Sequence, residues 1–156
     1  MADTTQIQGV IIKKLVKHCD DRGFLMELLR EQDTFFAEIK QTTYTESYPD
    51  VIKAFHYHKQ QDDLWFVAKG MAQVVMHDLR KGSATNGVTQ VVYAGEDNPV
   101  LLFIPRGVAH GYRVLGNERV GILYHTTAAY DPGSPDEHRI AHDDPAIGFD
   151  WHTKNR

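Results

Sequence analysis

The sequence predicts a single all-β domain that closes into a sandwich or barrel. Apolar residues recur in many short runs with the alternation that is typical of half-buried strands. Turn-forming residues separate these runs at regular intervals. Almost no stretch has a helical period, and 156 residues amount to about one domain with a sizeable core.

The strands are expected in the following order. The first lies within residues 7–17, where apolar side chains occupy both faces, as in a strand buried on both sides or at a subunit contact. Asp20-Asp21-Arg22-Gly23 predicts a hairpin tip, and residues 24–29 predict the returning strand. A helical turn is expected within residues 32–38, and a strand over residues 36–45. The remaining strands are expected at residues 51–58, 64–68, 71–79, 88–93, 100–104, 112–115 and 120–127.

Residues 129–156 differ in character from the predicted barrel strands of residues 7–128. The segment Ala129-Tyr-Asp-Pro-Gly-Ser-Pro135 interrupts any regular structure, but Ile147, Phe149 and Trp151 follow it. Apolar residues in a loop-like segment indicate a tail that packs back onto the barrel. Residues 1–156 are therefore expected to form one domain.

Composition and charge exclude several classes of function. A formal net charge of −4 gives no basic surface for nucleic acid or an anionic membrane. The single Cys19 excludes an internal disulfide and a thiolate-rich metal site, which suits a reducing, cytoplasmic location. The N-terminus has no signal-peptide pattern, and no apolar run has membrane-spanning length.

The segment Lys53-Ala-Phe-His56-Tyr-His58 has the strongest functional signal. On a strand, His56 and His58 project to one face while Phe55 and Tyr57 project to the other. Two imidazoles on one face can converge on a metal ion or on a substrate.

Two further polar residues belong to the same pattern. Asp63 opens the next strand after a short polar turn, and His110 follows the proline-glycine turn of Ile104-Pro-Arg-Gly107. These stretches resemble the two signature motifs of the cupin superfamily, which implies an all-β cupin jelly-roll barrel. The spacing of His56, His58, Asp63 and His110 is similar to that of metal-binding cupins, with aspartate where glutamate is usual. Three imidazoles and a carboxylate suit iron, manganese, zinc or nickel, so one hypothesis is a metal-dependent oxygenase or isomerase.

A second resemblance covers residues 20–151. Its segments, in chain order, are Arg22-Gly-Phe-x-x-Glu27, Val51-Ile-Lys-Ala-Phe-His56, Pro105-Arg-Gly-Val-Ala-His110-Gly-Tyr, Leu123-Tyr-His-Thr-Thr-Ala-Ala-Tyr130-Asp-Pro and Asp143-Asp-Pro followed by Asp150-Trp151. This ordered set resembles the dTDP-4-dehydrorhamnose 3,5-epimerase family, a branch of the cupins.

The epimerase resemblance implies proton transfer beside the ketone of a nucleotide-linked 4-keto-6-deoxy sugar, without a metal or organic cofactor. His56 matches the family's catalytic base, Asp144 the carboxylate that orients it, and Tyr130 the acid on the opposite face of the sugar. A histidine with a pKa of ~6.5 suits removal of the proton, and a tyrosine with a pKa of about 10 suits its return.

The same resemblance implies the substrate-binding residues and a partner. Arg22 and Glu27 match residues that contact the nucleotide in a neighbouring subunit's barrel, so a homodimer through the N-terminal strands is expected. Lys53 is expected beside the diphosphate. The other expected substrate-binding residues are His58, Asp63, His110, Tyr124 and His125.

Three positions depart from the family pattern. Lys53 replaces an arginine, His58 replaces a glutamine, and Asp63 replaces the lysine that stabilises the enolate. A carboxylate cannot donate to an oxyanion unless it is protonated. Either His58, Lys53 or His125 then supplies that charge, or the reaction is a single 3-epimerisation or a ketoisomerisation. A barrel that binds a sugar nucleotide without converting it is a further alternative, and the replacements at His58 and Asp63 also complete the metal-binding pattern.

Overall fold

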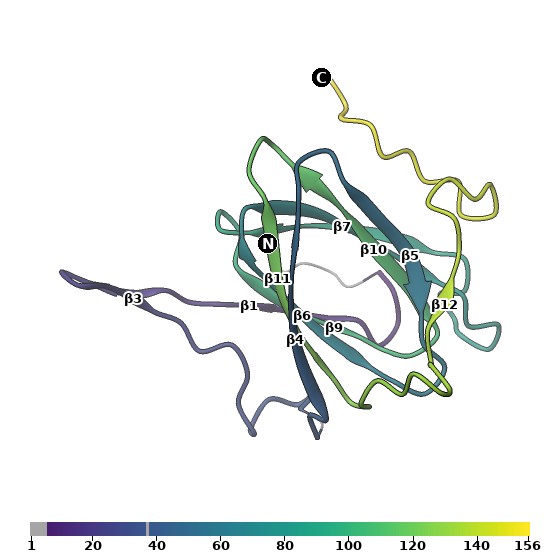
Figure 1. Ribbon diagram of the computed structural model, residues 1–156, viewed down its shortest axis with the longest axis horizontal. Helices are drawn as coiled ribbons and strands as arrows, with labels where there is room; N and C mark the ends of the chain where they lie inside the picture. The colour runs from purple at the N-terminus through teal and green to yellow at the C-terminus, as the bar shows by residue number, and fades with distance from the viewer. Residues whose placement is uncertain (1–5, 37) are drawn as a thin grey trace.

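The computed structural model describes residues 6–36 and 38–156, which form twelve β-strands and no α-helix (Figure 1). Two five-stranded antiparallel sheets face each other, in the orders β1-β9-β6-β11-β4 and β12-β5-β10-β7-β8, and β2 pairs with β3 in a separate hairpin. This arrangement confirms the predicted all-β cupin jelly roll. The strands are β1 Ile11–Lys14, β2 His18–Asp20, β3 Gly23–Leu25, β4 Gln41–Ser47, β5 Ile52–Tyr57, β6 Asp63–Lys69, β7 Met71–Asp78, β8 Thr89–Gly95, β9 Val100–Ile104, β10 Val108–Leu115, β11 Val120–Thr126 and β12 His138–Arg139.

Several boundaries differ from those predicted. The returning strand expected over residues 24–29 ends at Leu25, because Met26, Leu28 and Leu29 leave the hairpin and pack with Leu15 in an apolar cluster. Residues 32–35 form turns rather than a helical segment, and the following strand begins at Gln41. Ala37, within the range expected for that strand, lies outside the described residues.

The strand expected at residues 112–115 is twice as long as predicted. β10 begins at Val108 because it pairs with β7 along its whole length, from Val108 opposite Asp78 to Leu115 opposite Met71. The longer strand brings His110 into the sheet. His110 lies opposite His56 of β5, so the two predicted functional histidines are cross-strand neighbours.

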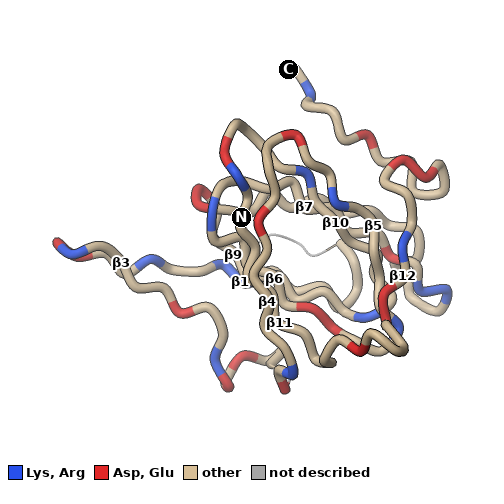
Figure 2. Tube along the Cα trace, viewed as in Figure 1, with Lys and Arg blue, Asp and Glu red and all other residues tan. Residues whose placement is uncertain are grey.

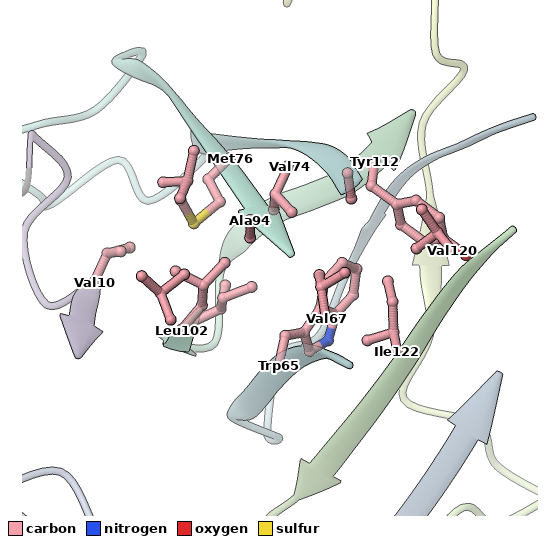
Figure 3. Packing of buried hydrophobic residues seen from close by; sticks show 14 of the residues in the cluster. Val10, Trp65, Val67, Val74, Met76, Ala94, Leu102, Tyr112, Val120 and Ile122 are labelled. Carbon is pink, nitrogen blue, oxygen red and sulfur yellow. The ribbon is translucent and has the colours of Figure 1, made fainter. Parts of the chain in front are cut away.

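The core fills the space between the two sheets. Inward-facing residues such as Trp65, Val74, Leu102 and Ile122 are almost fully buried there (Figure 3). Complete burial of a large apolar side chain contributes about 1.5–3 kcal/mol. β6 is covered on its other face as well, since Leu64 packs in the cluster that contains Leu15. The barrel wall that holds the site is therefore packed on both sides.

The two faces of β5 have different partners. Phe55 faces outward, and its ring centroid lies 5.4 Å from that of Trp151, while Ile147 and Phe149 pack in the same cluster. The tail thus lies against the outer face of this sheet. His56, one residue along, faces the barrel interior, as the alternation of the strand predicts.

The β2–β3 hairpin extends away from the barrel (Figure 1). Its turn follows the predicted Asp20-Asp-Arg-Gly23 sequence, and Gly23 has a φ of 137°, which disfavours other residues. Acidic and basic residues are mixed along the chain rather than gathered in one basic stripe (Figure 2). No helix among the described residues is long and apolar enough to cross a membrane.

Candidate active site

A cavity of about 940 Å³ opens into the barrel between β4, β5, β6 and β11. Residues 128–131 and 134–139 contribute to its rim. Among the predicted site residues, those that line the cavity are Lys53, His56, His58, Asp63, Tyr124 and Tyr130.

Four polar side chains converge at the inner end of this cavity. His56 and His58 come from β5, Asp63 from the start of β6, and His110 from β10. Each offers a ring nitrogen or carboxylate oxygen, and these atoms all lie within 4.8 Å of one another. The rings of His56 and His110 meet edge to face with centroids 4.2 Å apart. The structure therefore brings together the four residues of the predicted metal pattern.

Asp63 is the centre of this cluster and is only 2% exposed. Its Oδ2 lies 3.3 Å from Nε2 of His110 and 3.5 Å from Nε2 of His58. Gln61 Nε2 donates to Oδ1 over 2.7 Å, and Trp65 Nε1 donates to Oδ2 over 3.2 Å. Burial alone would raise the pKa of Asp63, but hydrogen bonds with His110 and His58 hold it far below its ordinary value. Asp63 is therefore a buried carboxylate anion.

Backbone carbonyls fix two of the imidazole rings. Nδ1 of His110 lies 2.9 Å from the carbonyl oxygen of Val108, and Nδ1 of His58 contacts the carbonyl oxygen of Asp136. A carbonyl can only accept, so each Nδ1 carries a proton and donates. The orientation of both rings is thereby set, with Nε2 directed at Asp63.

His56 and His58 differ electrostatically. Burial, followed by the neighbouring His110, lowers the pKa of His56 well below its ordinary value, which favours the neutral ring. Burial also opposes charge on His58, but the hydrogen bond and charge of Asp63, together with those of Asp136, raise the pKa of His58.

Asp136 and Arg139 are site residues that sequence reasoning missed. The Asp136 carboxylate accepts from the backbone amides of residues 59, 60 and 61, over 2.9, 2.8 and 3.1 Å, and ties the tail to the β5–β6 turn. These partners lie 75 to 77 residues away in sequence, so no local pattern indicates them. Arg139 lines the cavity from β12, where it pairs with His56.

Three predicted residues lie towards the cavity opening. Tyr130 is 61% exposed, and its backbone amide donates to Gln41 Oε1 over 2.9 Å. Lys53 is exposed beside the cavity, and Tyr124 is half-buried against Trp65. The opening therefore presents a phenol and an ammonium group.

Two predicted residues lie outside the cavity. His125 follows Tyr124 on β11 and projects to the opposite face, where its Nδ1 lies 2.9 Å from Thr42 Oγ1. Asp144 accepts from the amide of Ala146 over 2.8 Å and caps its own turn. The tail around Asp144 packs on the Phe55 face of β5, which is the side away from His56. The structure thus does not bring His125 or Asp144 to His56.

Arg22 and Glu27 also lie apart from the cavity of their own chain. Arg22, at the hairpin tip, pairs with Asp20, and its Nε lies 3.2 Å from Asp20 Oδ2. Glu27 lies 3.8 Å from Arg30 in an exposed ion pair. Neither residue lines the cavity of its own chain.

Comparison with known proteins decides the family. The model of the dTDP-4-dehydrorhamnose 3,5-epimerase family matches residues 4–156. The chain belongs to the dTDP-4-dehydrorhamnose 3,5-epimerase family. Its relatives include the spore coat polysaccharide biosynthesis protein SpsL of Bacillus subtilis, which is 57% identical over 150 residues, covering 96% of this chain and 99% of SpsL.

Other members of the epimerase family support the assignment. The dTDP-4-dehydrorhamnose 3,5-epimerase of Methanothermobacter thermautotrophicus is 32% identical, covering 94% of this chain and 81% of its own. The crystal structure of the dTDP-6-deoxy-D-glucose-3,5-epimerase of Legionella pneumophila, in complex with dTDP-4-keto-L-rhamnose, has a TM-score of 0.85 and 30% identity. That similarity covers 94% of this chain and 80% of the Legionella chain.

Proposed function

We propose that this family member epimerises a dTDP-linked 4-keto-6-deoxy sugar at C3, at C5 or at both, in deoxysugar or surface-polysaccharide biosynthesis. The observation that carries the proposal is the position of His56, whose imidazole faces the cavity from its inner end. The names of two relatives agree with it, one a spore coat polysaccharide biosynthesis protein and the other an epimerase solved with a dTDP-4-keto sugar.

The chemistry needs a base beside a ketone and an acid on the other face of the sugar ring. His56 is the base that removes the C–H proton, because its half-buried ring lies at the inner end of the cavity. Tyr130 is the acid, and its place at the cavity opening lets a sugar ring lie between the two residues. Because Asp144 lies on the far side of β5, the ring of His56 is oriented by its packing against His110 and Trp65.

The nucleotide diphosphate needs cations that the net charge of the chain does not supply. Lys53 and Arg139 line the cavity and can pair with phosphate oxygens. Arg22 and Glu27 act in the barrel of a second copy, which makes the enzyme a homodimer. Phe24 and Leu25 are 58% and 63% exposed on the hairpin, and such large apolar side chains gain stability when a partner covers them.

Solvent exchange during turnover tests the function. The protein is incubated in D2O with a dTDP-4-keto-6-deoxyglucose, and proton NMR follows the signals at C3 and C5. We expect deuterium at one or both carbons, together with an inverted product. Replacement of Tyr130 by Phe should preserve exchange but slow inversion, because His56 can return a deuteron only to the face from which it took the proton.

The matched control is His125→Gln, which changes a histidine on the outer face of β11 and should leave exchange intact. If the folded protein binds the nucleotide sugar but exchanges neither proton, the epimerase proposal is wrong and the chain is a sugar-nucleotide-binding protein.

A further inference from the structure

We propose that His58, Asp63 and His110 bind a divalent transition-metal ion at the inner end of the cavity, beside His56. The ion's catalytic role rests on the proposed epimerase function, but its binding does not. The proposal starts from the arrangement of lone pairs in the cluster.

Three lone-pair donors point at one small volume. Because Nδ1 of His58 and Nδ1 of His110 each donate to a backbone carbonyl, the Nε2 atoms of the neutral rings carry lone pairs. Both Nε2 atoms face Oδ2 of Asp63, which is an acceptor as well. A metal ion would take the place of the protons that otherwise lie between each Nε2 and Oδ2 of Asp63.

The separations suit a metal ion. Nitrogen and oxygen ligands about 2.0–2.2 Å from a central ion, at tetrahedral angles, lie roughly 3.3–3.5 Å apart. Oδ2 of Asp63 lies 3.3 Å from Nε2 of His110 and 3.5 Å from Nε2 of His58, and these two separations match those of a metal-bound site.

The residues around the ligands resemble a second coordination shell. A metal-binding imidazole usually donates its other N–H to a carbonyl or carboxylate, and a ligating carboxylate is itself hydrogen-bonded. Val108 and Asp136 supply the carbonyls, and Gln61 and Trp65 donate to the two oxygens of Asp63. All three ligands are thus held in orientation before an ion arrives.

The donor set selects the class of ion. Two imidazoles and one carboxylate, without a thiolate, suit zinc, cobalt, iron, manganese or nickel rather than magnesium or calcium, which prefer oxygen ligands. His56 and the cavity lie beside these three ligands, so a substrate carbonyl in the cavity would be near a bound ion. A bound divalent ion polarises a carbonyl oxygen and stabilises the enolate. Asp63 would then restore, through the metal, the positive charge that the family's lysine supplies at this position.

Cobalt binding to the metal-free protein tests the site. Protein made without a histidine tag is dialysed against a chelator and titrated with Co²⁺, which is followed by visible absorption and by competition with Zn²⁺. We expect about one Co²⁺ per chain. Asp63→Asn and His110→Gln should each weaken binding by at least about 100-fold, since loss of a second-shell partner alone costs 10–100-fold. His125→Gln, on the outer face of β11, should bind as the unchanged protein does.

The His56→Gln variant tests whether His56 is the base rather than a metal ligand. It should retain Co²⁺ binding within about threefold while proton exchange is lost. Loss of Co²⁺ binding in this variant would overturn our assignment of His56 as base rather than ligand. Circular dichroism checks that each variant is folded, and His58→Gln provides a third ligand substitution if Asp63→Asn does not fold.

Failure of the metal site and failure of the epimerase function give different results. A folded protein that binds neither Co²⁺ nor Zn²⁺ at micromolar concentrations overturns the metal proposal, whether or not it exchanges protons. Full exchange by metal-free protein removes the ion's catalytic role and leaves the epimerase proposal standing. Stoichiometric metal without exchange supports the site and overturns the epimerase function.

Discussion

The inner end of the cavity and the β2–β3 hairpin are organised in opposite ways. At the inner end, the buried His58, Asp63 and His110 and the half-buried His56 come together from three strands of one chain. The hairpin carries Arg22 and Phe24 into solvent and contacts no part of its own cavity (Figure 1). The inner end is built within a single chain, whereas the proposed role of the hairpin needs a second copy.

Under the proposed function, this difference separates proton transfer from nucleotide binding. Groups that move protons or hold an ion must be positioned closely, which a packed barrel interior does well. Groups that bind the nucleotide must extend to a part of the substrate that lies far from the reacting carbon. Rigid placement matters less for these groups. Variants at the inner end should therefore act on turnover, and variants of the hairpin on apparent affinity.

The largest effect is expected from His56→Gln. Removal of a general base costs about 10²–10⁴ in rate, so the turnover number should fall by about 10³-fold while substrate affinity changes little. Steady-state kinetics with a coupled reductase, together with NMR exchange, measure both quantities. A turnover number within tenfold of the unchanged protein would place the base elsewhere.

Removal of the metal should have the next largest effect. If the ion stabilises the enolate, chelation should lower the turnover number by about 100-fold, and added Zn²⁺ or Co²⁺ should restore it. A protein that keeps its turnover number after measured metal loss would show that the inner end works through its own side chains.

Arg22→Ala should act on affinity and reveal which barrel the hairpin serves. Loss of a charged hydrogen bond costs about 1.5–3 kcal/mol, so the KM should rise about 30-fold with little change in the turnover number. Mixed dimers of Arg22→Ala and His56→Gln chains sharpen the test. If the hairpin crosses to the partner, the Arg22→Ala barrel receives an intact arginine, and one site per mixed dimer regains normal KM. A hairpin that served its own barrel would leave no intact site in the mixture.

The local alternation of apolar and polar residues predicted the strands and which side chains of β5 face the barrel interior. It could do so because side-chain direction alternates from one residue to the next. The same alternation places Tyr124 and His125, adjacent on β11, on opposite faces, and Tyr124 is the one that lines the cavity. The approach of His110 to His56 depends on a cross-strand pair, which only the resemblance to known motifs suggested.

The path of the tail could not be predicted from the sequence. The Asp-Asp-Pro segment matched the family pattern, but the position of Asp144 is set by the contact of Trp151 with Phe55, which is a long-range packing interaction. The bonds from Asp136 to residues 59–61 are of the same kind. Contacts between segments so far apart leave no local signal in composition or spacing.

The smallest predicted effect comes from Trp65→Phe, which probes how firmly the inner end is preorganised. The substitution keeps an aromatic ring beside His110 but removes the Nε1 donor to Asp63 Oδ2. Co²⁺ affinity should fall about tenfold, as for other second-shell changes. Trp151→Phe is the matched control, because it removes the bond from Nε1 to the His142 carbonyl, 2.9 Å long, on the outer face of β5. Equal affinities for the two variants would mean that Asp63 needs no support from Trp65, and that its orientation depends on Gln61 and the two imidazoles.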